Sequence, residues 1–122
     1  MSYEISTSDN GKYVLIRVTE DITRELASRV AREASEFGAA QKLDKYLFDV
    51  RAAANIATLP SHYELAAEEL PALGFSAQAR FAVLVKAGDI SHDVVVTLVK
   101  QVGFNAHLFS DEEEALNWLD VG

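Results

Sequence analysis

Apolar and polar residues alternate near the start of the chain in a pattern typical of a β-hairpin. Residues 13–19 read as an extended strand, in which successive side chains point to opposite sides. An Asp-Asn-Gly-Lys turn signal at residues 9–12 separates this strand from a shorter one at residues 3–7. The apolar face of the second strand comprises Val14, Ile16 and Val18. We therefore predict two antiparallel strands at the start of the fold.

Apolar residues further along recur every three or four positions, which predicts amphipathic helices. The first helix follows Asp21 or Thr23 and ends where Gly38 stands just past Phe37. The inward residues that we predict for the helices are Leu26, Val30, Ala34 and Phe37 in the first, Tyr63, Ala66, Ala67 and Leu70 in the second, and Val95, Leu98, Val99 and Val102 in the third.

The other helix boundaries follow from prolines, glycines and caps. Pro60 starts the second helix and Pro71 ends or bends it, because proline lacks an N–H and clashes with the preceding turn. The third helix covers residues 91–102. A capping box that starts at Ser110 opens a short last helix.

Three short apolar runs alternate with these helices, at residues 46–50, 81–85 and 104–109. Such runs are typical of strands that are covered on both faces. The order β-β-α-β-α-β-α-β-α predicts an α/β sandwich, with a hairpin followed by alternating βα units. We expect a single domain over residues 1–122, built on a mixed sheet of about five strands with four helices, the later strands being parallel.

Composition narrows the classes of partner and site. The 11 Lys and Arg against 19 Asp and Glu give a formal net charge of −8, which disfavours nucleic acids and anionic membranes as partners. The absence of cysteine excludes disulfides, thiolate metal sites and a cysteine nucleophile. The start of the chain does not read as a signal peptide, and no apolar run is long enough to span a membrane. We expect a cytoplasmic protein.

Motifs of catalysis and of cofactor binding are missing from the sequence. His62, His92 and His107 fall in different segments without metal-ligand spacing, and we expect them to be solvated or at the edge of the core. Ser91, His92 and Asp93 are adjacent, so their side chains diverge on a helix and cannot relay a proton. We therefore expect no metal, no cofactor and no catalytic residue, and a protein that is not an enzyme.

Polar residues do gather after two of the predicted parallel strands. The loops beyond the carboxyl ends of such strands are where ligands and partners bind in open α/β sheets. The candidate partner, ligand or phosphorylation residues there are Asp49, Arg51, Thr58, Ser61, Lys86 and Asp89, with Asn55 in the same loop. Thr58 and Ser61 precede a helix, where they serve either as a phosphorylation or anion site or as a plain helix cap.

The end of the chain resembles a known family. Residues 104–119 read as a strand ending in Phe, an acidic helix start and then Ala-Leu-x-Trp-Leu. This stretch, together with the order of elements over nearly the whole chain, resembles the SpoIIAA-like branch of the STAS superfamily. The resemblance implies regulation through protein–protein contacts, in some members by phosphorylation of a Ser in an Asp-Ser-Ser-Gly motif. The matching residues 56–61 lack that motif, and Thr58 and Ser61 are the nearest hydroxyls.

Two functions follow as hypotheses. The first is a non-catalytic regulatory or protein-interaction domain that binds another protein or itself as a homodimer. The alternative is a module that binds a small apolar or lipid-like ligand, since the resemblance implies such ligands in some relatives. The alanine loop at residues 52–54 and the alanine-rich helix faces would leave room for that ligand between the helices and the sheet.

Overall fold

The sheet starts with the predicted hairpin. The computed structural model describes residues 2–121, in which β1 (Tyr3–Thr7) pairs antiparallel with β2 (Val14–Val18). Gly11 in the connecting turn has a φ of +72°, a conformation that glycine adopts at no steric cost. The alternation seen in the sequence is confirmed, because Val14, Ile16 and Val18 are buried.

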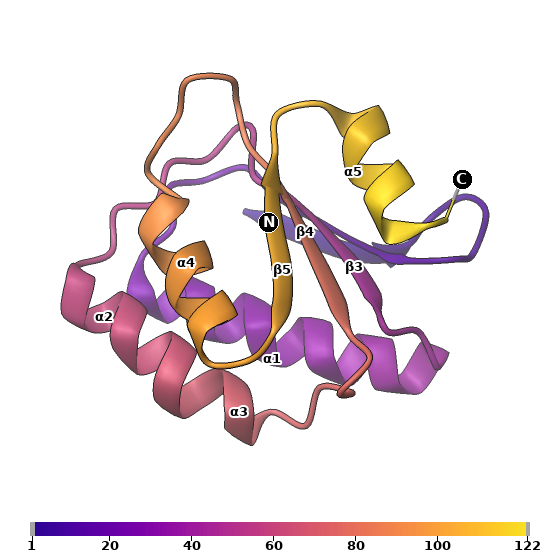
Figure 1. Cartoon of the computed structure of the whole chain (residues 1–122), viewed down its shortest axis with the longest axis horizontal. Helices are drawn as coiled ribbons and strands as arrows, with labels where there is room; N and C mark the ends of the chain where they lie inside the picture. Colours follow the sequence, from indigo (N-terminus) through magenta and orange to yellow (C-terminus); the bar gives the residue numbers. More distant parts are fainter. Residues whose placement is uncertain (1, 122) are drawn as a thin grey trace.

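Three parallel strands extend this hairpin into a mixed sheet (Figure 1). They are β3 (Lys45–Asp49), β4 (Arg80–Leu84) and β5 (Asn105–Phe109). Each pairs in parallel with the strand before it, so the sheet order β1-β2-β3-β4-β5 follows the chain. The predicted α/β class, with an opening hairpin, four helices and a five-stranded mixed sheet, is confirmed for the described residues.

The first helix is longer than predicted. Helix α1 (Arg24–Gln41) is capped by the Thr23 side chain and ends at Lys42, which has a φ of 58°. Gly38 was predicted to end the helix, and that prediction is wrong. Gly38 is instead buried inside α1, where the Tyr46 side chain fills the space that a Cβ atom would need. The glycine therefore serves close packing of the helix on β3.

The second helical segment is continuous but irregular. It runs through α2 (Leu59–Glu64), the π-helical turn η1 (Leu65–Glu69) and α3 (Leu70–Ala72). In the π turn the Leu70 N–H bonds the Leu65 carbonyl, five residues earlier. The π turn lies just before Pro71, which has no N–H to bond the preceding turn, and the helix continues past this proline to Ala72 instead of ending at it.

The inward face of this second segment differs from the prediction at one position. Ala66 and Leu70 are buried as expected, whereas Tyr63 is 61% exposed. His62 takes the buried place instead.

The last two helices form where they were predicted, but Val96, which was not in the predicted inward set, is buried, and the ends of both helices differ. Helix α4 (Asp93–Gln101) buries Val96 and Val99, while Val102 lies beyond it and is exposed. Helix α5 (Glu112–Leu119) is capped by Asp111 rather than by the predicted Ser110. One carboxylate oxygen of Asp111 accepts the backbone N–H groups of residues 113 and 114, at 2.8 and 3.3 Å.

Two hydrophobic cores lie on opposite faces of the sheet. The first core lies between the sheet and helices α1, α2, α3 and α4, and the second lies under α5 (Figure 1). Alternate residues of each inner strand feed the two cores. On β3 and β4, Tyr46 and Phe81 belong to the first core and Leu47 and Ala82 to the second. Within residues 2–121, none of the helices has both the length and the apolar character needed to cross a membrane.

Candidate functional site

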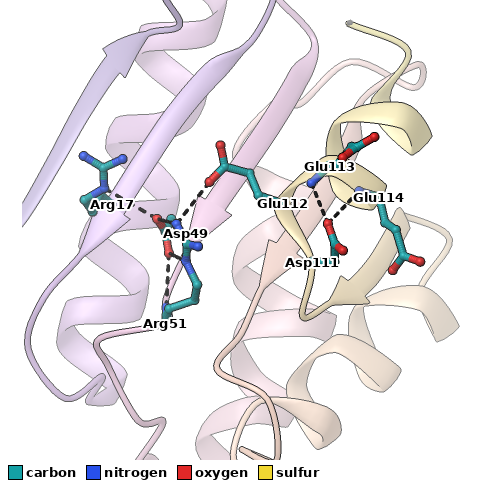
Figure 2. A network of polar contacts seen from close by, with 7 residues as sticks. All are labelled: Arg17, Asp49, Arg51, Asp111, Glu112, Glu113 and Glu114. Carbon is teal, nitrogen blue, oxygen red and sulfur yellow. Dashed lines mark hydrogen bonds and ion pairs between the residues drawn. The ribbon is translucent and has the colours of Figure 1, made fainter.

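The predicted residues Asp49 and Arg51 form an ion pair at the end of β3, on the α5 face of the sheet (Figure 2). The Arg51 guanidinium donates from Nε to one carboxylate oxygen at 3.0 Å and from a terminal nitrogen to the other at 2.8 Å. The backbone N–H of Arg51 adds a third hydrogen bond at 3.2 Å. The guanidinium therefore binds both oxygens of the carboxylate.

Two neighbours extend this pair across the sheet and to α5. Arg17, the register partner of Asp49 on β2, places its Nε 3.5 Å from the carboxylate, and Glu112 accepts a bond from Arg51 at 3.2 Å. Burial raises the pKa of Asp49, but the hydrogen bonds of Arg51 and the charges of both arginines outweigh it and leave the pKa below its ordinary value. The same carboxylate raises the pKa of Arg51. A carboxylate that is ionised at neutral pH and bonded in this way is suited to holding β2, β3 and α5 together.

Thr58 and Ser61 occupy the start of α2. Thr58 is the N-cap residue, and its hydroxyl accepts the backbone N–H of Ser61 at 3.4 Å. The two hydroxyl oxygens are 3.0 Å apart, within hydrogen-bonding distance. Of the two alternatives that the sequence left open, the structure directly supports the helix cap. The two hydroxyls lie apart from the Asp49 and Arg51 pair, so the six candidates do not form one site.

Asp89 shapes the loop before α4, and Lys86 lies exposed before it. The Asp89 carboxylate accepts the Ser91 N–H at 2.8 Å, and its other oxygen is 3.6 Å from Nε2 of His92. Bonding to Ser91 is the main cause that lowers the pKa of Asp89. The Ser91 hydroxyl in turn accepts the backbone N–H of Asn55 at 3.0 Å. The loops after β3 and β4 are thus joined, as expected for neighbouring parallel strands.

A cavity of about 140 Å³ lies inside the first core, between the sheet and the helices that cover it. Its wall comes from β2, α1, the π turn, α4 and the inner strands. Large apolar members are Leu26, Val30, Leu65, Leu70, Phe75 and Phe81. Small ones are Ala27, Ala31 and Ala106. The alanines that line the cavity lie on α1 and β5, and the inward helix alanines predicted from the sequence, Ala34, Ala66 and Ala67, are not among them.

Two polar side chains interrupt this apolar wall. Among the described residues that line the cavity, Asn55 and His92 alone carry side-chain nitrogen or oxygen atoms. His92 is 2% exposed, and its Nε2 donates to the Ala53 carbonyl at 3.0 Å. The predicted loop of small residues thus contributes its backbone to holding the histidine, while its alanine side chains stay outside the wall.

His62 and His92 lie deeper than the sequence led us to expect, whereas His107 is exposed. Burial lowers the pKa of His62, and the charge of nearby His92 lowers it further. Burial and the charge of Lys100 lower the pKa of His107 as well. No trio of carboxylate and imidazole groups suited to a metal ion occurs within residues 2–121.

The sequence analysis considered His92 as a metal ligand and as part of a proton relay and set it aside, and one further signal pointed to it. It stands at the N-cap position of α4 without capping the helix through its side chain, an unusual residue at a place that favours Ser, Thr, Asp or Asn. The sequence analysis named Asn55 only as a neighbour of the candidate residues at the edge of the sheet, and not as a residue of the core. Both residues face the first core, whereas Asp49 and Arg51 lie on the α5 side.

Comparisons with known proteins bear on the fold. No protein-family model and no curated protein matches the chain. An uncharacterized protein of the DUF3478 family with a SpoIIAA-like fold, from Shewanella loihica PV-4, matches with a TM-score of 0.57 at 16% identity, over 96% of this chain and 91% of that one. The anti-sigma factor antagonist SpoIIAA in its unphosphorylated form matches with a TM-score of 0.52 at 15% identity, over 98% and 99%.

A photosystem II D1 C-terminal processing protease matches with a TM-score of 0.57 at 11% identity, over 88% of this chain but only 36% of the protease. At such identities these likenesses establish the fold alone. The fold is SpoIIAA-like, as the resemblance in the sequence predicted.

Proposed function

We propose that the protein is a cytoplasmic, non-catalytic domain that binds a small apolar ligand in the cavity of its first core. The observation that carries this proposal is the cavity of about 140 Å³ with an almost wholly apolar wall. Protein interiors are normally close-packed, with few voids larger than a water molecule. An engineered apolar cavity of about 150 Å³ stays dry and binds benzene, so a space of this size suits one ring-sized molecule.

Toluene is a suitable probe for the proposal. Titration of the ¹⁵N-labelled protein, followed by amide NMR, should shift resonances around the cavity, and thermal unfolding should move to higher temperature because toluene binds only the folded state. The variant Ala31→Leu fills the cavity from α1 and should lose both responses. Ala40→Leu makes the same change at an exposed position of the same helix and should keep them.

Filling a core site can also destabilise the protein, by about 1–3 kcal/mol. Ala27→Leu, at a half-buried position of the same wall, therefore provides a milder second test. Binding of toluene that is equal in the wild type and in both filled variants would place the ligand elsewhere and refute the proposal. So would the absence of any response to toluene in the wild type.

A second candidate function is regulation through contact with another protein or with a second copy of the chain. It is favoured by large apolar side chains that are exposed in and just before α2 and α4, two helices that lie next to each other. We call them the apolar patch: Ile56, Leu59, Tyr63, Ile90 and Val94. Contiguous exposed apolar surface is a common mark of interaction sites.

Sedimentation equilibrium tests the homodimer form of this candidate. The wild type should associate, whereas the double variant Leu59→Lys and Ile90→Lys should be monomeric, because charges placed in the patch would have to be desolvated on association. Val102→Lys, at an exposed position beyond the other end of α4, is the matched control. A wild type that stays monomeric, or a dimer that the double variant leaves intact, would count against self-association through the patch.

A further inference from the structure

The polar side chains in the cavity wall carry information about the ligand. A purely apolar ligand needs no hydrogen-bonding partner, yet Asn55 and His92 both line the cavity. His92 is buried and Asn55 is half-buried, so the bonds that each one already makes show what capacity is left for a ligand.

His92 has one free position in its ring. A carbonyl oxygen can only accept, so the nitrogen that faces the Ala53 carbonyl carries the proton in the neutral imidazole. The Asp89 carboxylate lies near the same Nε2 atom, at 3.6 Å. Within residues 2–121 the other nitrogen, Nδ1, makes no hydrogen bond and is not fully buried, and in this tautomer it is an acceptor.

Asn55, in contrast, has an unused hydrogen-bond donor. Its side-chain oxygen accepts the backbone N–H of Ala57 at 3.0 Å. Its backbone N–H is bonded to the Ser91 hydroxyl, next to His92 in the chain. In the described part of the chain, the side-chain NH₂ of Asn55 donates to no partner, so a donor of Asn55 and an acceptor of His92 are left among the residues that line the cavity.

We propose that the ligand is a monocyclic, benzene-sized molecule that carries one hydroxyl group, the class to which phenol belongs. This inference rests on the proposed function and specifies it. A hydroxyl is the smallest group that both donates and accepts. It donates to Nδ1 of His92 and accepts from the NH₂ of Asn55, while the ring packs against the apolar remainder of the wall.

Phenol and toluene test the inference as a pair, since toluene replaces the hydroxyl with a methyl group of similar size. The measured quantity is the ratio of the two affinities, obtained by NMR titration. His92→Phe and Asn55→Leu should each lower the preference for phenol over toluene by about fivefold or more, the worth of a buried hydrogen bond. A variant that merely loosens the cavity weakens both ligands and leaves the ratio unchanged.

His62→Phe is the matched control, because it replaces the other buried histidine, which does not line the cavity. Its ratio should equal that of the wild type. A second readout needs no variant: phenol, but not toluene, should shift the ¹⁵N resonance of Nδ1 in His92, which covers the case in which the His92 variant does not fold.

The outcomes separate the two proposals. The hydroxyl inference is overturned if toluene binds, the ratio of phenol to toluene affinity is unchanged in both variants, and phenol leaves the Nδ1 resonance of His92 unmoved. The apolar cavity site would still stand in that case. Failure of both phenol and toluene to bind overturns the cavity site, and with it the inference that rests on it.

Discussion

The side chain of Tyr46 occupies the space that a Cβ atom at Gly38 would need. The ring of Tyr46 lies in the first core, where it contacts Phe75 edge-on and stacks on Phe81, with ring centroids 5.3 Å apart in both pairs. Tyr46 therefore cannot move aside without disturbing an aromatic cluster. The close approach of α1 to β3 depends on a glycine in the middle of a helix.

Gly38→Ala should destabilise the protein even though alanine is the better helix former by about 1 kcal/mol. The clash with Tyr46 should outweigh this gain and lower the free energy of unfolding by about 1–3 kcal/mol, as overpacking usually does. Urea denaturation measures the change. Adding Tyr46→Leu should make the Gly38→Ala substitution less costly than it is alone, and a Gly38→Ala protein as stable as the wild type would show that the contact is loose.

Asp49→Asn should lower the free energy of unfolding at neutral pH by about 1–3 kcal/mol, because it weakens a buried, hydrogen-bonded ion pair. The pKa of Asp49 lies below that of the unfolded chain, so the carboxylate stabilises the fold above about pH 4, and this is lost as the pH falls through the folded pKa. The difference between wild type and variant should therefore shrink in acid. Asp9→Asn, in the exposed hairpin turn, is the control and should show little difference at any pH.

Asp111→Ala should cost about 1 kcal/mol of stability, because it removes the side chain that caps α5. Ser110→Ala should cost little, since its exposed side chain does not cap the helix. Thermal unfolding of the two variants compares the predicted cap with the observed one. If Ser110→Ala lowered stability more than Asp111→Ala, the capping residue would be Ser110.

His62 should make stability fall in mildly acidic solution. Burial and the charge of His92 hold the folded pKa of His62 below the unfolded value of about 6.5. The neutral imidazole is therefore fully compatible with the fold above that pH, and stability is lost as the pH falls from the unfolded pKa toward the folded pKa. NMR titration of His62 should give a midpoint below about 6.5. His62→Phe should flatten the decline of stability between about pH 7 and pH 5. A midpoint at or above that of an unfolded histidine would contradict the burial argument.

The fold could be predicted from the sequence because its signals are local. The alternating pattern of β2 indicates a strand that is buried on one face, and the continuous apolar runs of β3 and β4 indicate strands that are buried on both. The order of the elements then limits the possible topologies. The errors fall where a long-range contact decides. Gly38 looked like a helix end because nothing local shows that Tyr46 packs over it.

The candidate site was harder to predict, because a cavity is an absence of atoms that several distant elements create together. Ala31 and Ala106 are 75 residues apart in the chain, yet both line it. The polar residues predicted at the sheet edge do not gather into one site, and Asp49 and Arg51 neutralise each other there. His92 was not recognised because its partner is a backbone carbonyl, which carries no sequence signal.

The sheet order follows the order of the strands in the chain, and this has a consequence for synthesis on the ribosome. Each new strand is added at the outer edge of the strands already made, and none has to be inserted between two that are paired. The first core can therefore assemble while the chain is still growing, and α5 seals the opposite face last. A nascent chain released after Phe109 would carry the complete sheet with Leu47, Ala82 and Leu84 uncovered, a surface that chaperones bind and that aggregates.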